Sequence, residues 1–360
     1  MAITKAILTG GGRATRLRPI TTTINKHLIP LAGKSMIFYA IEKAVEAGIK
    51  EIFINTNPGE TMLSKAVGDG SRWGIKIKYF EQQGGPQGIA HAVNCARELI
   101  GDEPFMFYLS DNVIFGSLVP LFQKFEQENL DCLLALAKVP DAKRFGVPAF
   151  DSAGKLVDVI EKPILPPSDY AVTGIYLYRP SYFEVFKSIK KSPRGEYEIS
   201  DIHSHFLKNN YKVGYEEITG WWKDTGNAQD LIGINRLLLD RQLISEFKIE
   251  TNCPPGVIKS ERVAIGKNVT IGSNVYISGP SIIEDDVSLE NCIILPYTTI
   301  GSGSKIKNAT IGESIIFSGC RLEVPIKIKE SIIGKDTIIT PHHQGDFQRL
   351  ILGDHTLVEL

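Results

Sequence analysis

The chain has 360 residues, of which 40 are basic and 41 acidic, so its formal net charge is −1. Apolar residues make up 43% and charged residues 22%, a balance that is typical of a globular protein and excludes a disordered or collagen-like chain. Because the charge is near zero and no apolar run approaches the roughly 18 residues of a membrane span, we predict no nucleic-acid partner, a local basic site aside, and no membrane partner.

The first two thirds of the chain alternate short apolar runs with segments of helical periodicity. Strands are predicted at residues 6–9, 51–55, 75–80, 105–109 and 156–160, and helices at 35–48, 89–100 and 231–244. Strand–helix–strand repeats of this kind predict an α/β fold, a Rossmann-like and mostly parallel sheet with helices on both faces. Ligands of such sheets lie outside the carboxyl ends of the strands.

From about residue 256 the pattern changes to a period of six. Aliphatic residues stand at Ile265, Ile271, Ile277, Ile283, Leu289 and Leu295, and after a shift of phase at Ile300, Ile306, Ile311 and Ile333. Such a period indicates one short strand per face of a triangular coil, with the aliphatic residues stacked inside, rather than a β-sandwich. We therefore predict a first domain at 1–245, a linker at 253–256, and a left-handed parallel β-helix within a second domain at 246–360.

The loop after the first predicted strand is rich in glycine and arginine: it contains Gly10, Gly11, Gly12, Arg13 and Arg16. Glycines let backbone N–H groups approach an anion, and arginines neutralise phosphate oxygens, so the loop favours phosphate binding over a plain turn. Lys26 is close enough in sequence to return to the same pocket. Neither the dinucleotide fingerprint nor the P-loop motif fits this loop or residues 33–35.

Acidic side chains follow other predicted strands. Asp111 comes directly after the run 105–109, and Asp224 lies in the unusual sequence 221–226. Mg²⁺ prefers one or two carboxylates together with phosphate oxygens and water. Beside the glycine–arginine loop, these acids predict a site for a metal and a triphosphate. Glu161 and Lys162 join an acid and a base at the end of a further strand.

The cysteines and the amino terminus bear on location. Five scattered cysteines without a C-x-x-C pair make a disulfide framework or zinc site improbable and fit a reducing compartment. The amino-terminal apolar segment is too short for a signal peptide. We expect a cytoplasmic protein.

Taken in order, several segments resemble the signatures of one family. They are 11–19 followed by Lys26, 68–71, 81–82 with Gly88, 110–112, 144–147, 161–163, 172–176, 194–199 and 222–226. The set resembles the sugar-1-phosphate nucleotidylyltransferases, and the chain is most similar to long members that append a β-helix and use dTTP and glucose 1-phosphate. The resemblance implies Mg²⁺-assisted, in-line attack of the sugar phosphate on the α-phosphorus, with release of pyrophosphate and no general base.

The resemblance also implies roles for individual residues. Arg16, Lys26 and Lys162 would be catalytic; Gly10, Gly11, Gly12, Arg13, Gln82, Gly88 and Asp111 would bind the nucleotide; Gly146, Glu161, Lys162, Val172, Tyr176 and Arg194 would bind the sugar phosphate; Asp111 and Asp224 would hold Mg²⁺. Four departures from the family pattern are Ala14, where glycine is usual, Ser35, where proline is usual, and His27 and Gln83, which border the base pocket.

Other readings stay open at this point. The nucleotide could be UTP, or the sugar another 1-phosphate. The β-helix could be an acetyltransferase using His342, His343 or His355, or a scaffold whose open ends drive assembly, so that a homo-oligomer is expected. A non-catalytic sensor of nucleotide sugars is the last alternative.

Overall fold

The computed structural model describes residues 2–12, 14–242, 258–259 and 261–341. Their contacts form two compact units. We call residues 1–13, 25–28 and 36–224 the sheet unit, and residues 14–24, 29–35 and 225–360 the coil unit. The predicted linker and the histidines at 342, 343 and 355 lie outside the described residues.

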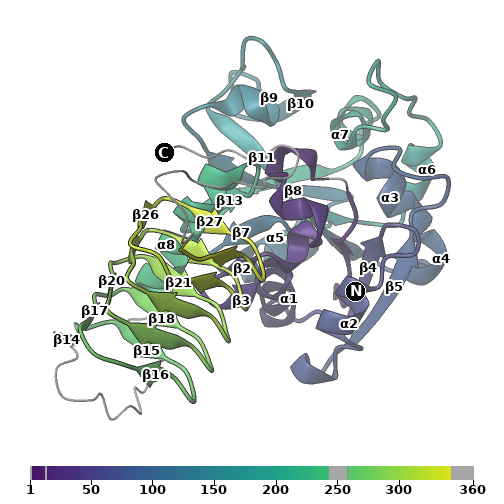
Figure 1. The fold of residues 1–360 in the computed structure, drawn as a ribbon. Helices are drawn as coiled ribbons and strands as arrows, with labels where there is room; N and C mark the ends of the chain where they lie inside the picture. Colours follow the sequence, from purple (N-terminus) through teal and green to yellow (C-terminus); the bar gives the residue numbers. More distant parts are fainter. Residues whose placement is uncertain (1, 13, 243–257, 260, 342–360) are drawn as a thin grey trace. The chain divides into compact units, whose positions relative to one another are not determined.

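The sheet unit is built on a seven-stranded sheet of order β12-β8-β11-β6-β1-β4-β5; β4, β5, β8 and β11 are labelled in Figure 1. The strands are β1 (Lys5–Thr9), β4 (Glu51–Thr56), β5 (Lys76–Glu81), β6 (Phe105–Tyr108), β8 (Cys132–Lys138), β11 (Tyr170–Tyr178) and β12 (Val213–Glu217). Strand β11 is antiparallel to β6 and β8, and the other neighbours are parallel. The predicted mostly parallel sheet is confirmed.

Helices cover both faces of this sheet. They are α1 (Met36–Glu46), α2 (Met62–Val67), α3 (Ile89–Cys95), α4 (Arg97–Ile100), α5 (Val119–Gln127), α6 (Ser181–Phe186) and α7 (Ile199–Lys208). Side chains of α1, α2 and α5 pack with Leu8 in one buried core, while those of α3, α6 and α7 pack with Ile7 in another. Because neighbouring strand residues point to opposite faces, Ile7 and Leu8 of β1 serve different cores.

One predicted helix, at 89–100, is wrong as a single element. The structure divides it at Ala96, whose φ of −89° and ψ of 5° depart from helical values. The Ala96 N–H bonds the Val93 carbonyl at 3.0 Å, a tighter i to i−3 turn that interrupts the ladder. The periodic pattern of apolar residues continues across such a break, so the sequence pattern did not reveal the break.

Two antiparallel ribbons extend the edge of the sheet where the strands end. Strands β9 (Gly146–Phe150) and β10 (Leu156–Glu161) form one, and β7 (Asn112–Ile114) and β13 (Trp222–Asp224) form the other. Both ribbons carry residues that the sequence singled out.

The coil unit contains three five-stranded parallel sheets, drawn in green and yellow in Figure 1. Their strands are β14 (Ile258–Lys259), β15 (Val263–Ile265), β16 (Thr270–Ile271), β17 (Val275–Ile277), β18 (Ser281–Ile283), β19 (Ser288–Glu290), β20 (Cys292–Ile294), β21 (Thr298–Ile300), β22 (Lys305–Lys307), β23 (Thr310–Gly312), β24 (Ile315–Ile316), β25 (Arg321–Leu322), β26 (Lys327–Lys329), β27 (Ile332–Ile333) and β28 (Ile338–Ile339). In register, Ile265, Ile283 and Ile300 stack on one another. The predicted left-handed parallel β-helix is confirmed.

The phase shift of the six-residue pattern falls one repeat earlier than predicted, between Leu289 and Ile294 and not between Leu295 and Ile300. Ile294, with no exposed surface, pairs in register with Ile277 and Ile311, whereas Leu295 is 37% exposed. The cause is a short corner, because Asn291 alone separates β19 from β20, with a left-handed φ of 48°. Leu295 is therefore not an inward residue of the coil.

The remaining elements of the coil unit are α8 (Ala228–Gln242), β2 (Pro30–Leu31), β3 (Lys34–Ser35), and the 3₁₀ turns η1 (Thr15–Leu17) and η2 (Ile20–Thr22). The buried Asn235 of α8 accepts hydrogen bonds from Ala32 N at 2.8 Å and from Thr299 Oγ1 at 3.2 Å. One amide thus links the helix, the β2–β3 hairpin and strand β21. Among the described residues no helix has both the length and the apolar character needed to cross a membrane.

Candidate active site

The glycine loop leaves β1 at its carboxyl end and is held by asparagines from the neighbouring parallel strand. Gly10 N and Gly11 N donate to Asn55 Oδ1 at 3.3 and 3.4 Å, and Gly12 N donates to Asn57 Oδ1 at 3.0 Å. A Cβ on Gly10 would lie 2.7 Å from the Asn55 carbonyl oxygen, so only glycine fits there. Around Gly12 a Cβ would meet nothing within 4 Å, which leaves open space over the loop.

Sequence reasoning did not single out these asparagines. The available signal was that Asn55 ends the predicted strand 51–55 and Asn57 follows two residues later; a parallel sheet places this strand beside β1. A third asparagine, Asn25, donates from Nδ2 to the Gly10 carbonyl at 2.9 Å. The loop is therefore held from both sides by side-chain amides.

The structure describes only one of the two predicted site arginines of the loop. Arg13 lies outside the described residues, and Arg16 is an exposed residue of η1 in the coil unit. Ala14, which replaces the usual glycine, has a φ of 44° and a ψ of 40°. This left-handed backbone conformation is higher in free energy for alanine, which has a Cβ, than for glycine.

Lys26 and Asp111, far apart in sequence, meet at the end of β6. The Lys26 Nζ lies 2.6 Å from Asp111 Oδ2, and Asn112 Nδ2 donates to Asp111 Oδ1 at 2.9 Å. Burial acts to raise the pKa of Asp111, but the charges of Lys26 and His27 and the hydrogen bonds from Lys26 and Asn112 together lower it. Burial also lowers the pKa of His27 to about 4. Asp111 is therefore an ionised carboxylate beside a neutral imidazole at pH 7.

Asp224 is brought to the same ribbon. In the β7–β13 pairing Asp224 stands opposite Asn112, the residue that follows Asp111. The Trp222 Nε1 donates to Asn112 Oδ1 at 2.9 Å, which fixes the ribbon further. Asp111 directly precedes β7 and Asp224 ends β13, so the pairing brings the two acidic residues to the same end of the ribbon. Carboxylates are ligands that Mg²⁺ prefers, together with phosphate oxygens and water. No cluster of three or more His, Cys, Asp or Glu side chains occurs in the part of the chain that the structure describes.

Gln82 and Gly88 also lie together. The Gln82 Nε2 is 3.1 Å from the Gly88 carbonyl oxygen and 3.0 Å from His91 Nδ1. Gly88 has a φ of +99°, and a Cβ there would lie 2.5 Å from the Tyr197 carbonyl oxygen. Glycine is thus required at position 88 on both grounds.

A cationic group gathers around Glu161. Its Oε1 lies 3.3 Å from Lys162 Nζ and 3.9 Å from Arg194 Nη2, and Gly146 stands opposite it in register. Glu198, which sequence reasoning missed, accepts from Arg194 Nε at 3.1 Å and Nη2 at 2.7 Å. This hydrogen bonding raises the pKa of Arg194. The two cations and the carboxylate of Glu161 can face a substrate that bears both a phosphate and hydroxyls.

Lys162 has a left-handed backbone, with a φ of 44°. Its N–H donates to the Phe145 carbonyl oxygen at 2.9 Å, across the end of the β9–β10 ribbon. A lysine held in this conformation is strained, and such strain concentrates at functional sites.

Strand β11 supplies residues that lie near both the Lys26–Asp111 pair and the Glu161 group. Val172 and Tyr176 are both buried, and Val172 Cβ would lie 3.8 Å from a Cβ on Gly146. Burial raises the pKa of the Tyr176 phenol, and the charges of Glu161 and Asp111 raise it further. Tyr176 is therefore within electrostatic reach of both the Lys26–Asp111 pair and the Glu161 group.

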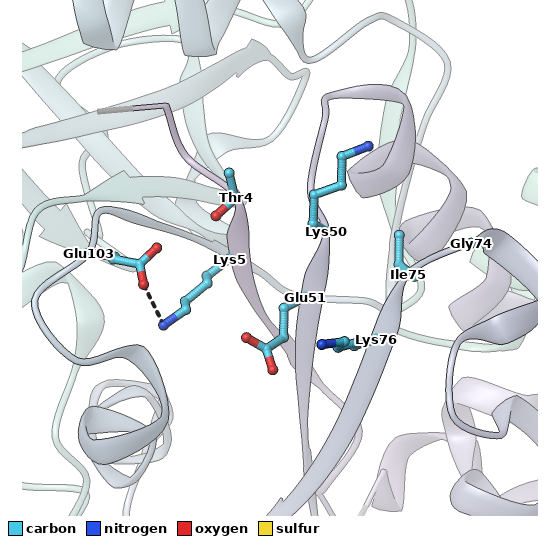
Figure 2. A pocket seen from close by; sticks show the side chains of 8 residues that line it. All are labelled: Thr4, Lys5, Lys50, Glu51, Gly74, Ile75, Lys76 and Glu103. Atoms are coloured by element: carbon cyan, nitrogen blue, oxygen red, sulfur yellow. Dashed lines mark ion pairs between the residues drawn. The ribbon is translucent and has the colours of Figure 1, made fainter.

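A cavity of about 590 Å³ lies elsewhere on the sheet unit, at the amino-terminal ends of β1, β4 and β5 (Figure 2). It is lined by Thr4, Lys5, Lys50, Glu51, Gly74, Ile75, Lys76 and Glu103. Lys5 is paired with Glu103 at 2.8 Å, as the dashed line in Figure 2 marks. The cavity contains none of the predicted site residues, and we assign it no part in the candidate site.

Comparison with known proteins identifies the family and supports the fold. Residues 5–241 match the family model described as nucleotidyl transferase, and residues 253–342 match that of the GMPPB C-terminal domain. The chain is 34% identical over 358 residues to a glucose-1-phosphate thymidylyltransferase of Streptomyces antibioticus, covering 99% of each chain.

Solved structures agree. A Bacillus anthracis protein in complex with sucrose has a TM-score of 0.62 at 34% identity, over 68% of this chain and 97% of its own. UDP-glucose pyrophosphorylase complexed with UDP-glucose has a TM-score of 0.60 at 26% identity, over 67% of this chain and 100% of its own. The chain belongs to the nucleotidyl transferase family. Within that family it is a sugar-1-phosphate nucleotidyltransferase, as the sequence motifs predicted.

Proposed function

We propose that this enzyme transfers the nucleotidyl group of dTTP to glucose 1-phosphate, giving dTDP-glucose and pyrophosphate with Mg²⁺. The similarity to the Streptomyces antibioticus thymidylyltransferase over 99% of both chains carries this proposal. The geometry supports this proposal. Asp111 follows β6, the neighbour of the strand that leads into the glycine loop, and its pair with Lys26 suits a triphosphate. The Glu161 group suits a sugar phosphate.

In the reaction an oxygen of the sugar phosphate bonds to the α-phosphorus. The bond from that phosphorus to the bridging oxygen breaks, and its electron pair leaves with pyrophosphate. Lys26, together with Arg13 and Arg16, would neutralise the growing charge on the leaving group. The contact of its Nζ with Asp111 Oδ2, at 2.6 Å, holds the lysine side chain in this region before substrate arrives.

Asp111 and Asp224 would hold Mg²⁺, which, when bound, makes the α-phosphorus more electrophilic and screens the two approaching anions. Asn112 would orient Asp111 through the hydrogen bond at 2.9 Å. Because its pKa is lowered, Asp111 is ionised at pH 7, as a ligand for a hard cation must be.

On the other side, Lys162 and Arg194 would bind the phosphate of the sugar, and Glu161 would accept hydrogen bonds from its hydroxyls. Glu198 would hold the Arg194 guanidinium through two hydrogen bonds, and Val172 and Tyr176 would line the sugar pocket. A phosphate monoester is already an anion at pH 7, so no residue is required as general base.

Release of pyrophosphate tests the proposal. Wild-type enzyme with Mg²⁺ and glucose 1-phosphate should release it fastest with dTTP among dTTP, UTP, CTP, GTP and ATP, and Asp111→Asn should lose the activity. Preference for UTP is the second candidate, favoured by the fold shared with UDP-glucose pyrophosphorylase. Release with only another nucleotide would overturn the choice of dTTP, and no release with any pair would favour the nucleotide-sugar sensor.

The further expectations stay predictions. A homo-oligomer, a scaffold role for the β-helix and a cytoplasmic location follow from sequence alone. The acetyltransferase alternative depends on His342, His343 and His355, which lie outside the described residues.

A further inference from the structure

The neighbours of Gln82 allow only one assignment of the nitrogen and oxygen of its side-chain amide. Its nitrogen lies 3.1 Å from the carbonyl oxygen of Gly88. A carbonyl oxygen only accepts hydrogen bonds, so the NH₂ group and not the oxygen of the amide must face it. The same nitrogen lies 3.0 Å from His91 Nδ1.

This arrangement also determines the tautomer of His91. Because the Gln82 NH₂ can only donate, His91 Nδ1 must accept, and the ring proton must be on Nε2. Cys95 Sγ, one helical turn further along α3, lies 3.9 Å from His91 Nδ1 and 3.8 Å from Nε2, so it packs beside the ring and does not determine the tautomer. Burial, with a smaller contribution from the charge of Lys191, lowers the pKa of His91, so the ring is neutral at pH 7.

Aromatic neighbours hold the His91 ring. Tyr197 stacks on it with centroids 6.0 Å apart and planes at 21°, and Phe186 contacts it with centroids 6.2 Å apart. Tyr197 is itself fixed, because its N–H donates to the Gln87 carbonyl oxygen at 2.8 Å and its own carbonyl accepts from Ala90. The acceptor at Nδ1 is thus a preorganised feature of the site.

Both hydrogens of the Gln82 amide are used by Gly88 and His91, and no described residue donates to its Oε1. We infer that His91 is a positioning residue that turns the Gln82 carbonyl oxygen toward the base and so selects pyrimidines with a ring N–H, thymine or uracil, over cytosine. The inference rests on the proposed function, in that a nucleotide binds here, and on the nucleotide-binding role that the family resemblance implies for Gln82, which we assign to contact with the base. Thymine and uracil can donate a hydrogen bond from N3–H to Oε1. The N3 of cytosine carries no hydrogen, so cytosine would place one acceptor against another and form no hydrogen bond there.

Two substitutions separate the hydrogen bond from the packing of the ring. His91→Leu keeps an apolar side chain beside Tyr197 and Phe186 but removes the acceptor. His91→Asn places its Oδ1 near the position of Nδ1 and so restores an acceptor. For wild type and both variants, kcat/KM is measured with dTTP and with CTP, and the binding of each nucleotide is measured by calorimetry. Thermal melting reports whether each variant is folded.

We expect the dTTP-to-CTP ratio to fall by about 10-fold or more in His91→Leu and to return to within about threefold of wild type in His91→Asn. A loss of packing alone would lower activity with both nucleotides and leave the ratio unchanged, which would overturn the inference while the proposed function stands. The inference also fails if His91→Asn behaves as His91→Leu does. If wild type forms no nucleotide sugar but binds dTTP over CTP in a His91-dependent way, the inference stands and the proposed function fails.

Discussion

The sheet unit and the coil unit use the same type of element, the parallel strand, for different purposes. In the coil unit the residues that matter point inward and repeat along the chain, as Ile265, Ile283 and Ile300 do in adjacent coils. In the sheet unit they gather near the carboxyl ends of strands, where residues distant in sequence meet: Lys26, which belongs to no strand, lies 2.6 Å from Asp111 at the end of β6. Stacking buries apolar surface and gives stability, whereas convergence at strand ends gathers charge and gives chemistry.

The largest effect should come from a strand end in the sheet unit. Asp111→Asn removes a charge that pairs with Lys26 and would hold Mg²⁺, so we expect kcat/KM for pyrophosphate release to fall by about 100- to 1,000-fold. Asp102→Asn, at an exposed aspartate ahead of the same strand, is the matched control and should stay near wild type. If Asp111→Asn kept a tenth or more of the activity, Asp111 would not belong to the reaction centre.

The coil unit should respond in stability and not in chemistry. Ile294→Ala empties a position with no exposed surface, and we expect the free energy of unfolding to fall by about 3 kcal/mol, from urea titrations. Leu295→Ala, at the neighbouring residue that is 37% exposed, should cost less than about 1 kcal/mol. Equal losses in the two variants would contradict the short corner at Asn291.

A buried histidine of the sheet unit should make its stability depend on pH. Burial lowers the pKa of His203 to about 3, below the ordinary value near 6.5, so the unfolded chain binds the extra proton first as pH falls. Stability from this group is therefore complete above about pH 6.5 and is lost progressively toward pH 3. Between pH 7.5 and 5 we expect a loss of about 2 kcal/mol.

Chemical denaturation at the two pH values measures this loss. His203→Gln removes the titrating group while keeping a donor and an acceptor for Tyr178, whose hydroxyl is 2.7 Å from His203 Nε2. The variant should show a smaller change between the two pH values than wild type. An unchanged dependence on pH would assign the effect to other groups.

The smallest effect is expected at Ala14. Ala14→Gly relieves a left-handed backbone with a φ of 44° but adds freedom to the unfolded chain, so the two contributions nearly cancel and the free energy of unfolding should change by less than about 1 kcal/mol. Activity should stay the same or rise by about twofold. A large loss of activity would mean that the Ala14 methyl group itself contributes to the loop.

How much could be predicted from sequence depends on the same contrast. The β-helix was predictable because its inward residues recur at a fixed period in the sequence. The error at Leu295 arose where a single-residue corner changed that period. The glycine loop and Asp111 were predictable because each follows an apolar strand directly. Asn55 and Glu198 were not, because their importance depends on which strand or loop lies beside them in space.

Competition among nucleotides tests the central claim most directly. The enzyme is given equal concentrations of dTTP, UTP, CTP, GTP and ATP with glucose 1-phosphate and Mg²⁺, and the nucleotide sugars are identified by mass spectrometry. We predict dTDP-glucose as the main product of wild type, with at most about a hundredth as much from Asp111→Asn. A different main product, or dTDP-glucose formed equally well by Asp111→Asn, would contradict the account.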